Sequence, residues 1–312
     1  MKKDVNFAVV IVTYNRKILL EECVEAILDQ SFPVERIIII DNASSDGTNK
    51  ILERYKEDNR FFIKEEKKNQ GGAYGFYEGI KIALGFSWEW LIIIDDDAIL
   101  SHNFIKIIHE AIFKYPKNKA FSGRVLTKGF TAREHRARNS LKVLYKPFPV
   151  SLKEYEKESF EYELSSFCGL VINRGVIEKI GLPLKDLFIR NDDFEYSLRM
   201  RRLTKIRNIN SALINHKTVI TTMEKDFSWK LFYNMRNAIY ISGKYYGIIA
   251  KIEICIRYLF GMLFNSIRYG VIGDKSITYV TRIYRDSILA GIKNEIGIDL
   301  RYYPQNTMTE ER

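Results

Sequence analysis

Cysteine is scarce in this sequence, and its scarcity excludes two kinds of stabilising centre. The 312 residues include three cysteines, Cys23, Cys168 and Cys255, which are widely spaced and odd in number. No C-x-x-C pair occurs, so the sequence predicts neither a disulfide framework nor a cysteine-bound zinc ion. We therefore expect a protein of a reducing compartment, the cytoplasm.

Apolar runs long enough to cross a bilayer are also lacking. The run FAVVIV near the N-terminus is too short for the core of a signal peptide, so we expect a first β-strand there. The most lipid-like stretch is Ile248–Ile272, whereas about 20 apolar residues are needed to span a bilayer. Four charged residues interrupt it: Lys251, Glu253, Arg257 and Arg268.

Acidic residues do not balance the basic ones. Lys and Arg number 49 against 39 Asp and Glu, which gives a net charge of +10. Such a balance suits nucleic acid, anionic lipid or phosphorylated ligands. The basic residues are dispersed among acidic ones, and no RNP-like or zinc-finger signature occurs. We therefore expect no nucleic-acid partner.

Strand-like runs alternate with helical patterns through the first half of the chain. The runs are FAVVIVTY, RIIIID, FFIKEE and WLIIIDDD. Helical spacing follows the first three of them, at Lys17–Gln30, Thr48–Tyr55 and Phe76–Leu84. This alternation predicts an α/β protein with a mostly parallel sheet, flanked by helices on both faces. In such a sheet, ligands bind outside the carboxyl ends of the strands.

The C-terminal part has a different pattern. Beyond Phe227 it is helical and rich in aromatic residues as far as about Ile292. We therefore divide the chain into an α/β domain, residues 1–225, and a C-terminal helical region, residues 226–312.

Three adjacent carboxylates, Asp95, Asp96 and Asp97, follow the fourth strand. Their charges repel one another unless a cation neutralises them. On an extended segment Asp95 and Asp97 point the same way, which suits two oxygen ligands on one Mg²⁺ or Mn²⁺. The alternative is a solvated acidic turn. The position directly after a buried strand favours the metal.

Two weaker signals lie after the second and third strands. Asp41 ends the run RIIIID and could accept a hydrogen bond from a base or a ribose hydroxyl, or belong to an ordinary turn. The glycine-rich segment Asn69–Gly75 would let the backbone approach a ligand closely. It matches neither a dinucleotide-binding fingerprint nor a P-loop, so taken alone it predicts a turn.

Two further sites are ambiguous when taken singly. Asp192 and Asp193 precede an amphipathic stretch, where a helix cap is the simpler interpretation. A reaction that activates an acceptor hydroxyl would instead use such a carboxylate as its base. His216 ends a strand-like run, where a structural role and a metal-ligand role stay open.

In combination, these segments resemble the glycosyltransferases of family 2, which have the GT-A (Rossmann-like) fold. The resemblance rests on VVIVTYNR (Val9–Arg16), IIIIDNASSDGT (Ile37–Thr48), NQGGAYGF (Asn69–Phe76), IIIDDDAIL (Ile92–Leu100) and NDDFEYSLRMRR (Asn191–Arg202). It spans roughly Phe7–Val219. Galactofuranosyltransferase-like and rhamnosyltransferase-like members are the most similar in pattern.

This resemblance implies roles for individual residues. Those expected to contact the nucleotide-sugar donor are Thr13, Tyr14, Arg16, Asp41, Asn69, Gly71, Gly72, Asp95 and Asp96. Asp95 and Asp97 would contact Mn²⁺ or Mg²⁺, with His216 as a further ligand. Asp193 would be the catalytic base, with Asp192 beside it and the choice between the two left open.

The implied reaction is inverting transfer of a sugar from a UDP- or dTDP-sugar to a glycan or lipid-linked glycan, in bacterial surface polysaccharide synthesis. Galactofuranose, galactose and rhamnose all fit the resemblance. One alternative is a sugar nucleotidyltransferase, but these enzymes have a glycine-rich loop after the first strand and VTYNRK has no glycine. The other is a catalytically inactive sugar-nucleotide-binding protein, which the intact acidic motifs disfavour.

The segment Tyr245–Tyr284 combines many apolar residues with several lysines and arginines. Such a segment can lie on an anionic bilayer, where a lipid-linked acceptor would be met. We therefore expect a cytoplasmic protein with peripheral contact at the inner face of the membrane. The equal alternative is that these helices pack on the catalytic domain or form a homo-oligomer.

Overall fold

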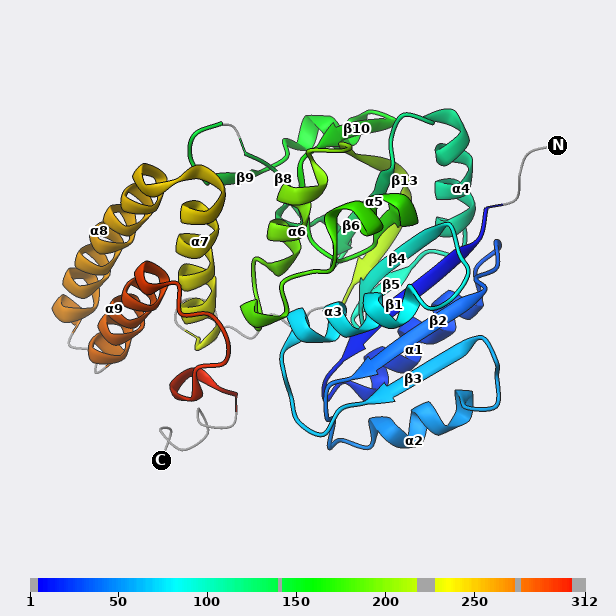
Figure 1. The fold of residues 1–312 in the computed structure, drawn as a ribbon, viewed down its shortest axis with the longest axis horizontal. Helices are drawn as coiled ribbons and strands as arrows, with labels where there is room; N and C mark the ends of the chain where they lie inside the picture. The colour runs from blue at the N-terminus through cyan, green and yellow to red at the C-terminus, as the bar shows by residue number, and fades with distance from the viewer. Residues whose placement is uncertain (1–4, 140–141, 218–227, 273–275, 305–312) are drawn as a thin grey trace. The chain divides into compact units, whose positions relative to one another are not determined.

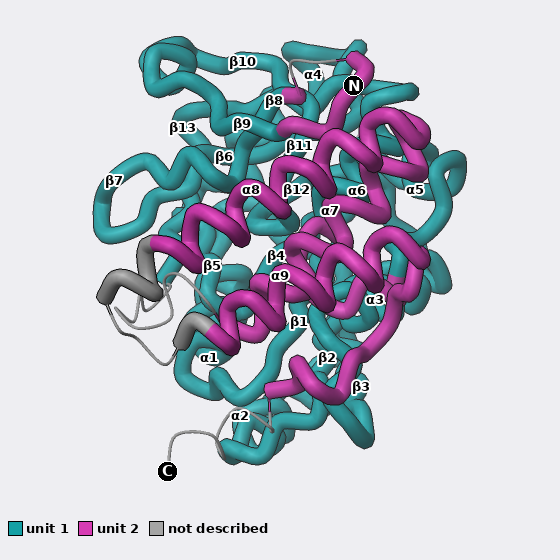
Figure 2. Tube along the Cα trace, turned by 90° about the vertical axis from the view of Figure 1, so that its left-hand side faces the viewer, with its two compact units in different colours: residues 1–138, 147–184, 193–218 teal, residues 139–146, 185–192, 219–312 magenta. Residues whose placement is uncertain are grey.

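The computed structural model describes residues 5–139, 142–217, 228–272 and 276–304. It divides into two compact units, coloured separately in Figure 2. Unit 1 comprises residues 1–138, 147–184 and 193–218, and unit 2 comprises residues 139–146, 185–192 and 219–312. The boundary expected between residues 225 and 226 lies outside the described residues.

Unit 1 is built around one mixed sheet. Its strands are β1 (Phe7–Thr13), β2 (Arg36–Asp41), β3 (Phe61–Glu65), β4 (Trp90–Asp95), β5 (Ala98–Leu100), β6 (Ala120–Thr127), β7 (Phe130–Thr131), β10 (Ser159–Tyr162), β12 (Leu170–Asn173) and β13 (Ile206–His216). They run in the order β10-β13-β6-β12-β4-β1-β2-β3, with β5 on β13 and β7 on β6. The strands β1 to β4 are parallel, as predicted, whereas β12 is antiparallel to both β4 and β6. A second sheet contains β8 (Arg136–Asn139), β9 (Pro147–Pro149) and β11 (Leu164–Ser165).

Helices cover both faces of the large sheet, which confirms the α/β class (Figure 1). Those of unit 1 are α1 (Lys17–Leu28), α2 (Thr48–Leu52), α3 (Gly72–Ala83), α4 (Phe104–Lys114), α5 (Arg174–Ile180) and α6 (Asp192–Met200). Val9 and Ile11 of β1 pack with α1 and α4, whereas Val10 and Val12 pack with α3. Every residue of β1 is buried, because successive side chains point to opposite, covered faces.

Helix α3 begins at Gly72, earlier than the predicted Phe76. Glycine is a poor helix former, so the pattern of NQGGAYG concealed this first turn. The packing of the helix requires two of its glycines. A Cβ atom at Gly75 would lie 2.5 Å from a methyl of Val12, and one at Gly79 would lie 2.5 Å from a methyl of Val10. The close approach of α3 to β1 therefore depends on glycine.

Unit 2 contains the predicted C-terminal helices, α7 (Lys230–Tyr246), α8 (Ile248–Ile272) and α9 (Ser276–Lys293), which pack on one another (Figure 1). Its core consists of Phe188, Phe232, Tyr233, Ile283, Ala290 and Tyr302. Phe188 belongs to the short segment 185–192 and not to a helix. Among the described residues, no helix is both long and apolar enough to cross a membrane.

Candidate active site

The carboxyl ends of three parallel strands meet at one edge of the large sheet. Thr13 of β1 lies in register with Asp41 of β2, and Val12 of β1 lies in register with Asp95 of β4. Thr13, Asp41 and Asp95 therefore end neighbouring strands. This is the edge at which open α/β sheets bind ligands.

Arg16 and Thr13 hold the acidic triplet from one side. The Thr13 hydroxyl donates to Asp96 over 2.7 Å, and Arg16 Nη1 donates to Asp96 over 3.1 Å and to Asp97 over 2.5 Å. Burial raises the pKa of Asp96 to about 6, although the Arg16 charge and the Thr13 hydrogen bond oppose this. Arg16, expected to face the donor, is thus also the counter-ion of the triplet.

His216 reaches the triplet through an antiparallel pair of strands. On β13 it lies opposite Ala98 of β5, and the Lys217 amide donates to the Asp97 carbonyl over 2.7 Å. His216 Nε2 then lies 3.2 Å from Asp97 Oδ1. That oxygen is buried and accepts no hydrogen bond of ordinary geometry from the residues that the structure describes. Two potential metal ligands thus converge, although they are far apart in sequence.

At this edge of the sheet, the negative charge of the carboxylates exceeds the positive charge of the neighbouring side chains. Burial raises the pKa of Asp95, and the neighbouring Asp97 carboxylate raises it further. Burial would also raise the pKa of Asp97, but His216 and Arg16 outweigh it and lower that pKa. A divalent cation would relieve the repulsion within the triplet. Carboxylate oxygens suit Mn²⁺ or Mg²⁺, and the Asp97 carboxylate meets the His216 imidazole here, so the residues present fit such an ion.

Asn42 joins the end of β2 to the glycine-rich segment. Its side-chain nitrogen donates to the Gly71 carbonyl over 2.8 Å, and its side-chain oxygen accepts from the backbone amide of Gln70. The Asn69 side chain accepts from the Gly71 amide over 2.8 Å. Asn69, Gly71 and Gly72 are thus held beside the end of β2. Asn42 was not among the predicted site residues, and its position directly after Asp41 was the available signal.

Asp41 and Asp46 both bind local backbone groups. Asp41 accepts hydrogen bonds from the amide and hydroxyl of Ser44, and burial raises its pKa. Asp46 accepts from the amides of Lys17 and Thr48, the first residues of α1 and α2. Asp46 therefore caps helices. Tyr14, at the end of β1, is half-buried.

Gly72 differs from the glycines that pack on β1. A Cβ atom there would meet nothing within 4 Å, so packing within the chain does not require glycine at this position. Gly71, just before it, has a φ of 84°, which favours glycine.

Helix α6 starts with the two remaining acidic residues. Asp192 is buried and Asp193 half-buried, and Asp193 Oδ1 accepts from the Phe194 amide over 2.7 Å. The division between the units falls between these two residues, so Asp193 shares unit 1 with the acidic triplet.

A histidine and a cysteine that were not among the predicted site residues lie beside His216. The possible ligand atoms of His135, Cys168 and His216 lie within 4.8 Å of one another. His135 Nδ1 also contacts the Ser166 hydroxyl at 2.9 Å. The irregular region from Lys128 to Ser159 offered no periodicity from which to locate His135.

The parallel strand ends, the covered sheet and the acidic edge define an α/β enzyme of the GT-A kind. Residues 8–181 match the profile of glycosyl transferase family 2. The chain belongs to this family.

Three proteins show what this chain is similar to. A glycosyltransferase GlyG of Streptococcus pneumoniae is 32% identical over 106 residues, 34% of this chain and 34% of that protein. This match thus spans about a third of the relative's length. A Methanococcus voltae protein, "Dolichyl N-acetyl-alpha-D-glucosaminyl phosphate 3-beta-D-2,3-diacetamido-2,3-dideoxy-beta-D-glucuronosyltransferase", is 24% identical over 300 residues, 92% of this chain and 88% of that protein. The crystal structure of GalNAc-T7 with UDP, GalNAc and Mn²⁺ has a TM-score of 0.61 at 15% identity, covering 100% of this chain and 58% of that one.

Proposed function

We propose that this protein transfers a sugar from a UDP- or dTDP-sugar to a hydroxyl of a glycan or lipid-linked glycan, with Mn²⁺ or Mg²⁺ and with inversion at the anomeric carbon. The observation that carries the proposal is the convergence of Asp97 and His216 beside Asp95, at the edge where Thr13 and Asp41 end their strands. GalNAc-T7, a structural neighbour, was determined with UDP and Mn²⁺, which supports the choice of nucleotide and ion.

Asp95, Asp97 and His216 would hold the divalent ion, which supplies positive charge that stabilises the departing nucleoside diphosphate. Arg16 keeps Asp96 and Asp97 in place from the protein side. The proton of the acceptor hydroxyl passes to a carboxylate at the start of α6 as the oxygen attacks the anomeric carbon.

The side chains at the ends of β1 and β2 would bind the nucleoside. Asp41 offers a buried carboxylate to a base N–H or a ribose hydroxyl. At Gly72, the absence of a side chain and the open space around it let a ribose or pyrophosphate approach the backbone. These contacts would select the nucleotide part of the donor. The identity of the transferred sugar would depend on other residues, further from the nucleotide.

The donor is identified by testing a panel of UDP-galactofuranose, UDP-galactose, UDP-N-acetylglucosamine and dTDP-rhamnose for nucleotide release and product formation. We expect turnover with one donor class, dependent on Mn²⁺ or Mg²⁺ and abolished by EDTA. NMR of the product reports the anomeric configuration. Turnover that persists in EDTA, or a product with retained configuration, contradicts the corresponding part of the proposal.

A lipid-linked acceptor is supported by the name of the Methanococcus voltae relative, which describes an enzyme acting on a dolichyl-linked sugar. An apolar stripe on α8 supports the same inference: Ile249, Ile252, Ile256, Phe260, Leu263 and Phe264 are all exposed. Their spacing places them along the helix as on an interfacial amphipathic helix. We propose that this stripe lies on the inner face of the cell membrane.

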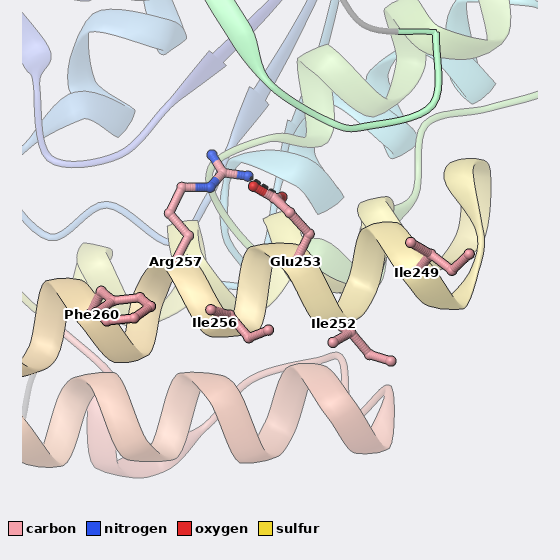
Figure 3. Close-up of a pocket in the computed structure, with 6 residues that line it drawn as sticks. All are labelled: Ile249, Ile252, Glu253, Ile256, Arg257 and Phe260. Atoms are coloured by element: carbon pink, nitrogen blue, oxygen red, sulfur yellow. Dashed lines mark hydrogen bonds and ion pairs between the residues drawn. The ribbon is translucent and has the colours of Figure 1, made fainter.

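The basic residues near the stripe are partly engaged within unit 2. Lys251 Nζ donates to the Ile292 carbonyl and to Asn294, and Arg257 pairs with Glu253 one turn away (Figure 3). Apolar contact would therefore carry more of the membrane affinity than these two charges.

Vesicle flotation tests the membrane contact. We expect binding to vesicles of phosphatidylglycerol and phosphatidylcholine, and loss of binding in the double variant Phe260→Glu, Phe264→Glu. Phe130→Glu is the matched control, because Phe130 is at least as exposed as Phe260 and Phe264 but lies on β7. If the wild type does not bind, and light scattering shows a dimer that the double variant dissociates, the stripe is an oligomer interface instead.

A further inference from the structure

The segment 185–192, which leads into the acidic start of α6, has an unusual backbone. Phe188, Arg190 and Asn191 all have positive φ angles, of 65°, 68° and 62°. Asparagine tolerates this left-handed region, but phenylalanine and arginine adopt it rarely because of their Cβ atoms. Such a conformation persists only where surrounding contacts determine it, and clusters of this kind are found at functional sites.

Asn237 of α7 supplies three of these contacts. Its amide nitrogen lies within hydrogen-bond distance of three carbonyl oxygens, those of Leu187 (2.9 Å), Ile189 (3.0 Å) and Arg190 (2.8 Å). Asn237 is fully buried, so water does not compete for these acceptors. One side chain thus binds three of the four carbonyls of residues 187–190, a stretch that is not part of a β-ladder.

Arg236 fixes the orientation of that amide. Its Nε and Nη2 atoms donate to Asn237 Oδ1 over 3.0 and 2.9 Å, so the amide nitrogen must face the carbonyls. The same guanidinium donates to the carbonyls of Leu187 (3.2 Å) and Gly297 (2.6 Å). Burial lowers its pKa to about 10, which leaves it protonated at neutral pH.

A second set of contacts holds the end of the segment. The Asn191 amide nitrogen donates to the carbonyl and the side-chain oxygen of Asn234, over 3.1 and 2.8 Å. The Tyr145 hydroxyl donates to Asn191 Oδ1 over 2.9 Å. Phe188 packs its ring 4.7 Å from that of Tyr233. Residues 187–191 are therefore anchored from several directions within unit 2.

We propose that Arg236 and Asn237 are positioning residues, which fix the backbone of residues 187–191 and thereby aim the carboxylates that follow it, Asp192 and Asp193. Asp193 lies only two peptide units beyond Asn191, so a changed dihedral angle at Arg190 or Asn191 would displace it. A displacement of about 1 Å at a catalytic group can reduce the rate about 10²-fold. The inference rests on the proposed role of Asp193 as the base.

The test is a double-mutant cycle between Asn237→Ser and Asp193→Asn, with transfer measured for the donor and acceptor found active in the panel. We expect Asn237→Ser to lower kcat by about 10- to 100-fold and to leave the affinity for UDP with Mn²⁺, measured by calorimetry, unchanged. In the Asp193→Asn background the same substitution should cost little more, because the group that it positions is already disabled. A merely structural role would reduce activity by the same factor in both backgrounds.

Asn265→Ser is the matched control. This asparagine lies on α8, and its amide also donates twice within unit 2, to the Gly261 carbonyl and the Tyr284 hydroxyl. It should leave kcat unchanged. If Asn237→Ser does not fold, Arg236→Lys is a milder variant. Lysine keeps the positive charge but lacks the pair of guanidinium nitrogens that donate to Asn237 Oδ1.

The outcomes separate the two proposals. Full activity of both Asn237→Ser and Arg236→Lys, or multiplicative losses in the cycle, overturns the positioning role. Full activity of Asp193→Asn would instead show that Asp193 is not the catalytic base, whatever the effect of Asn237→Ser on the rate.

Discussion

Two regions of the molecule hold functional carboxylates by different means. At the acidic edge of unit 1, Asp41 and Asp95 end strands whose backbones are paired in a parallel ladder. The segment 185–192 has no ladder, and the side chains of Arg236 and Asn237 hold its carbonyls instead. A ladder uses groups that every residue possesses, whereas the second arrangement depends on two particular side chains. The first region should therefore tolerate neighbouring substitutions better than the second.

The largest effect should come from removing a side chain at the acidic edge itself. We expect Asp97→Ala to reduce transfer by at least about 10²-fold, comparable to the loss of a charge-stabilising group in other active sites. It should also abolish the Mn²⁺-dependent stabilisation by UDP, which for the wild type is about 2.7 kcal/mol at 100 times Kd. Kinetics and thermal unfolding measure the two effects. Asp29→Asn, at an exposed carboxylate, is the control, and a fully active Asp97→Ala would exclude the metal role.

At the start of α6, Asp193→Asn keeps the shape of the side chain and removes its basicity. We expect transfer to fall by at least about 10²-fold, while the affinity for UDP with Mn²⁺ is retained. Steady-state kinetics measures the rate of transfer, and calorimetry measures the affinity for UDP. If Asp192→Asn is the inactive variant and Asp193→Asn is active, the base is Asp192.

The two kinds of glycine in α3 allow a matched pair of alanine substitutions. Gly75→Ala places a Cβ atom 2.5 Å from Val12 and should destabilise the fold by about 1–3 kcal/mol in urea unfolding. The Cβ atom of Gly72→Ala meets nothing within 4 Å, so this substitution should not destabilise the fold, but it should lower the affinity for UDP. Equal destabilisation by both substitutions would show that Gly72 serves packing rather than binding.

The smallest effect concerns the cap at Asp46. Burial would raise its pKa, but hydrogen bonds from Thr48 and Lys17 outweigh burial and lower it. A carboxyl group whose pKa is lowered by folding stabilises the protein above its unfolded pKa of about 3.9, and this contribution is lost as the pH falls through the folded value. Asp46→Ala should therefore cost about 0.5–2 kcal/mol at pH 7, and this cost should shrink as the pH falls below about 3.9. A difference in unfolding free energy that does not change with pH would contradict the capping role.

Much of unit 1 could be predicted from local patterns. The runs that became β1, β2 and β4 are continuously apolar because both faces of the sheet are covered, and each ends in a polar residue where the strand ends. The antiparallel strand β12 could not be foreseen in the same way. An apolar run does not reveal the direction in which its strand enters the sheet.

The candidate site was predicted in part. Asp95, Asp97 and His216 were selected from the sequence. In the structure His216 contacts Asp97, and the charges of both act on Asp95. Asn42, His135, Arg236 and Asn237 were not selected. Their contacts join residues far apart in the chain, or involve backbone carbonyls whose positions no local pattern encodes.

The α/β alternation, the carboxylates at the strand ends and the helical C-terminal region could be predicted from local patterns, because each depends on periodicity and on residue type over short distances. The hydrogen bond from Lys217 to the Asp97 carbonyl, which brings His216 to the triplet, became visible only in the folded chain. The folded chain also shows that α7 binds the carbonyls of residues 187–190, just before Asp192 and Asp193. The physical reason is that such contacts depend on how distant segments pack, and that packing belongs to the folded chain as a whole.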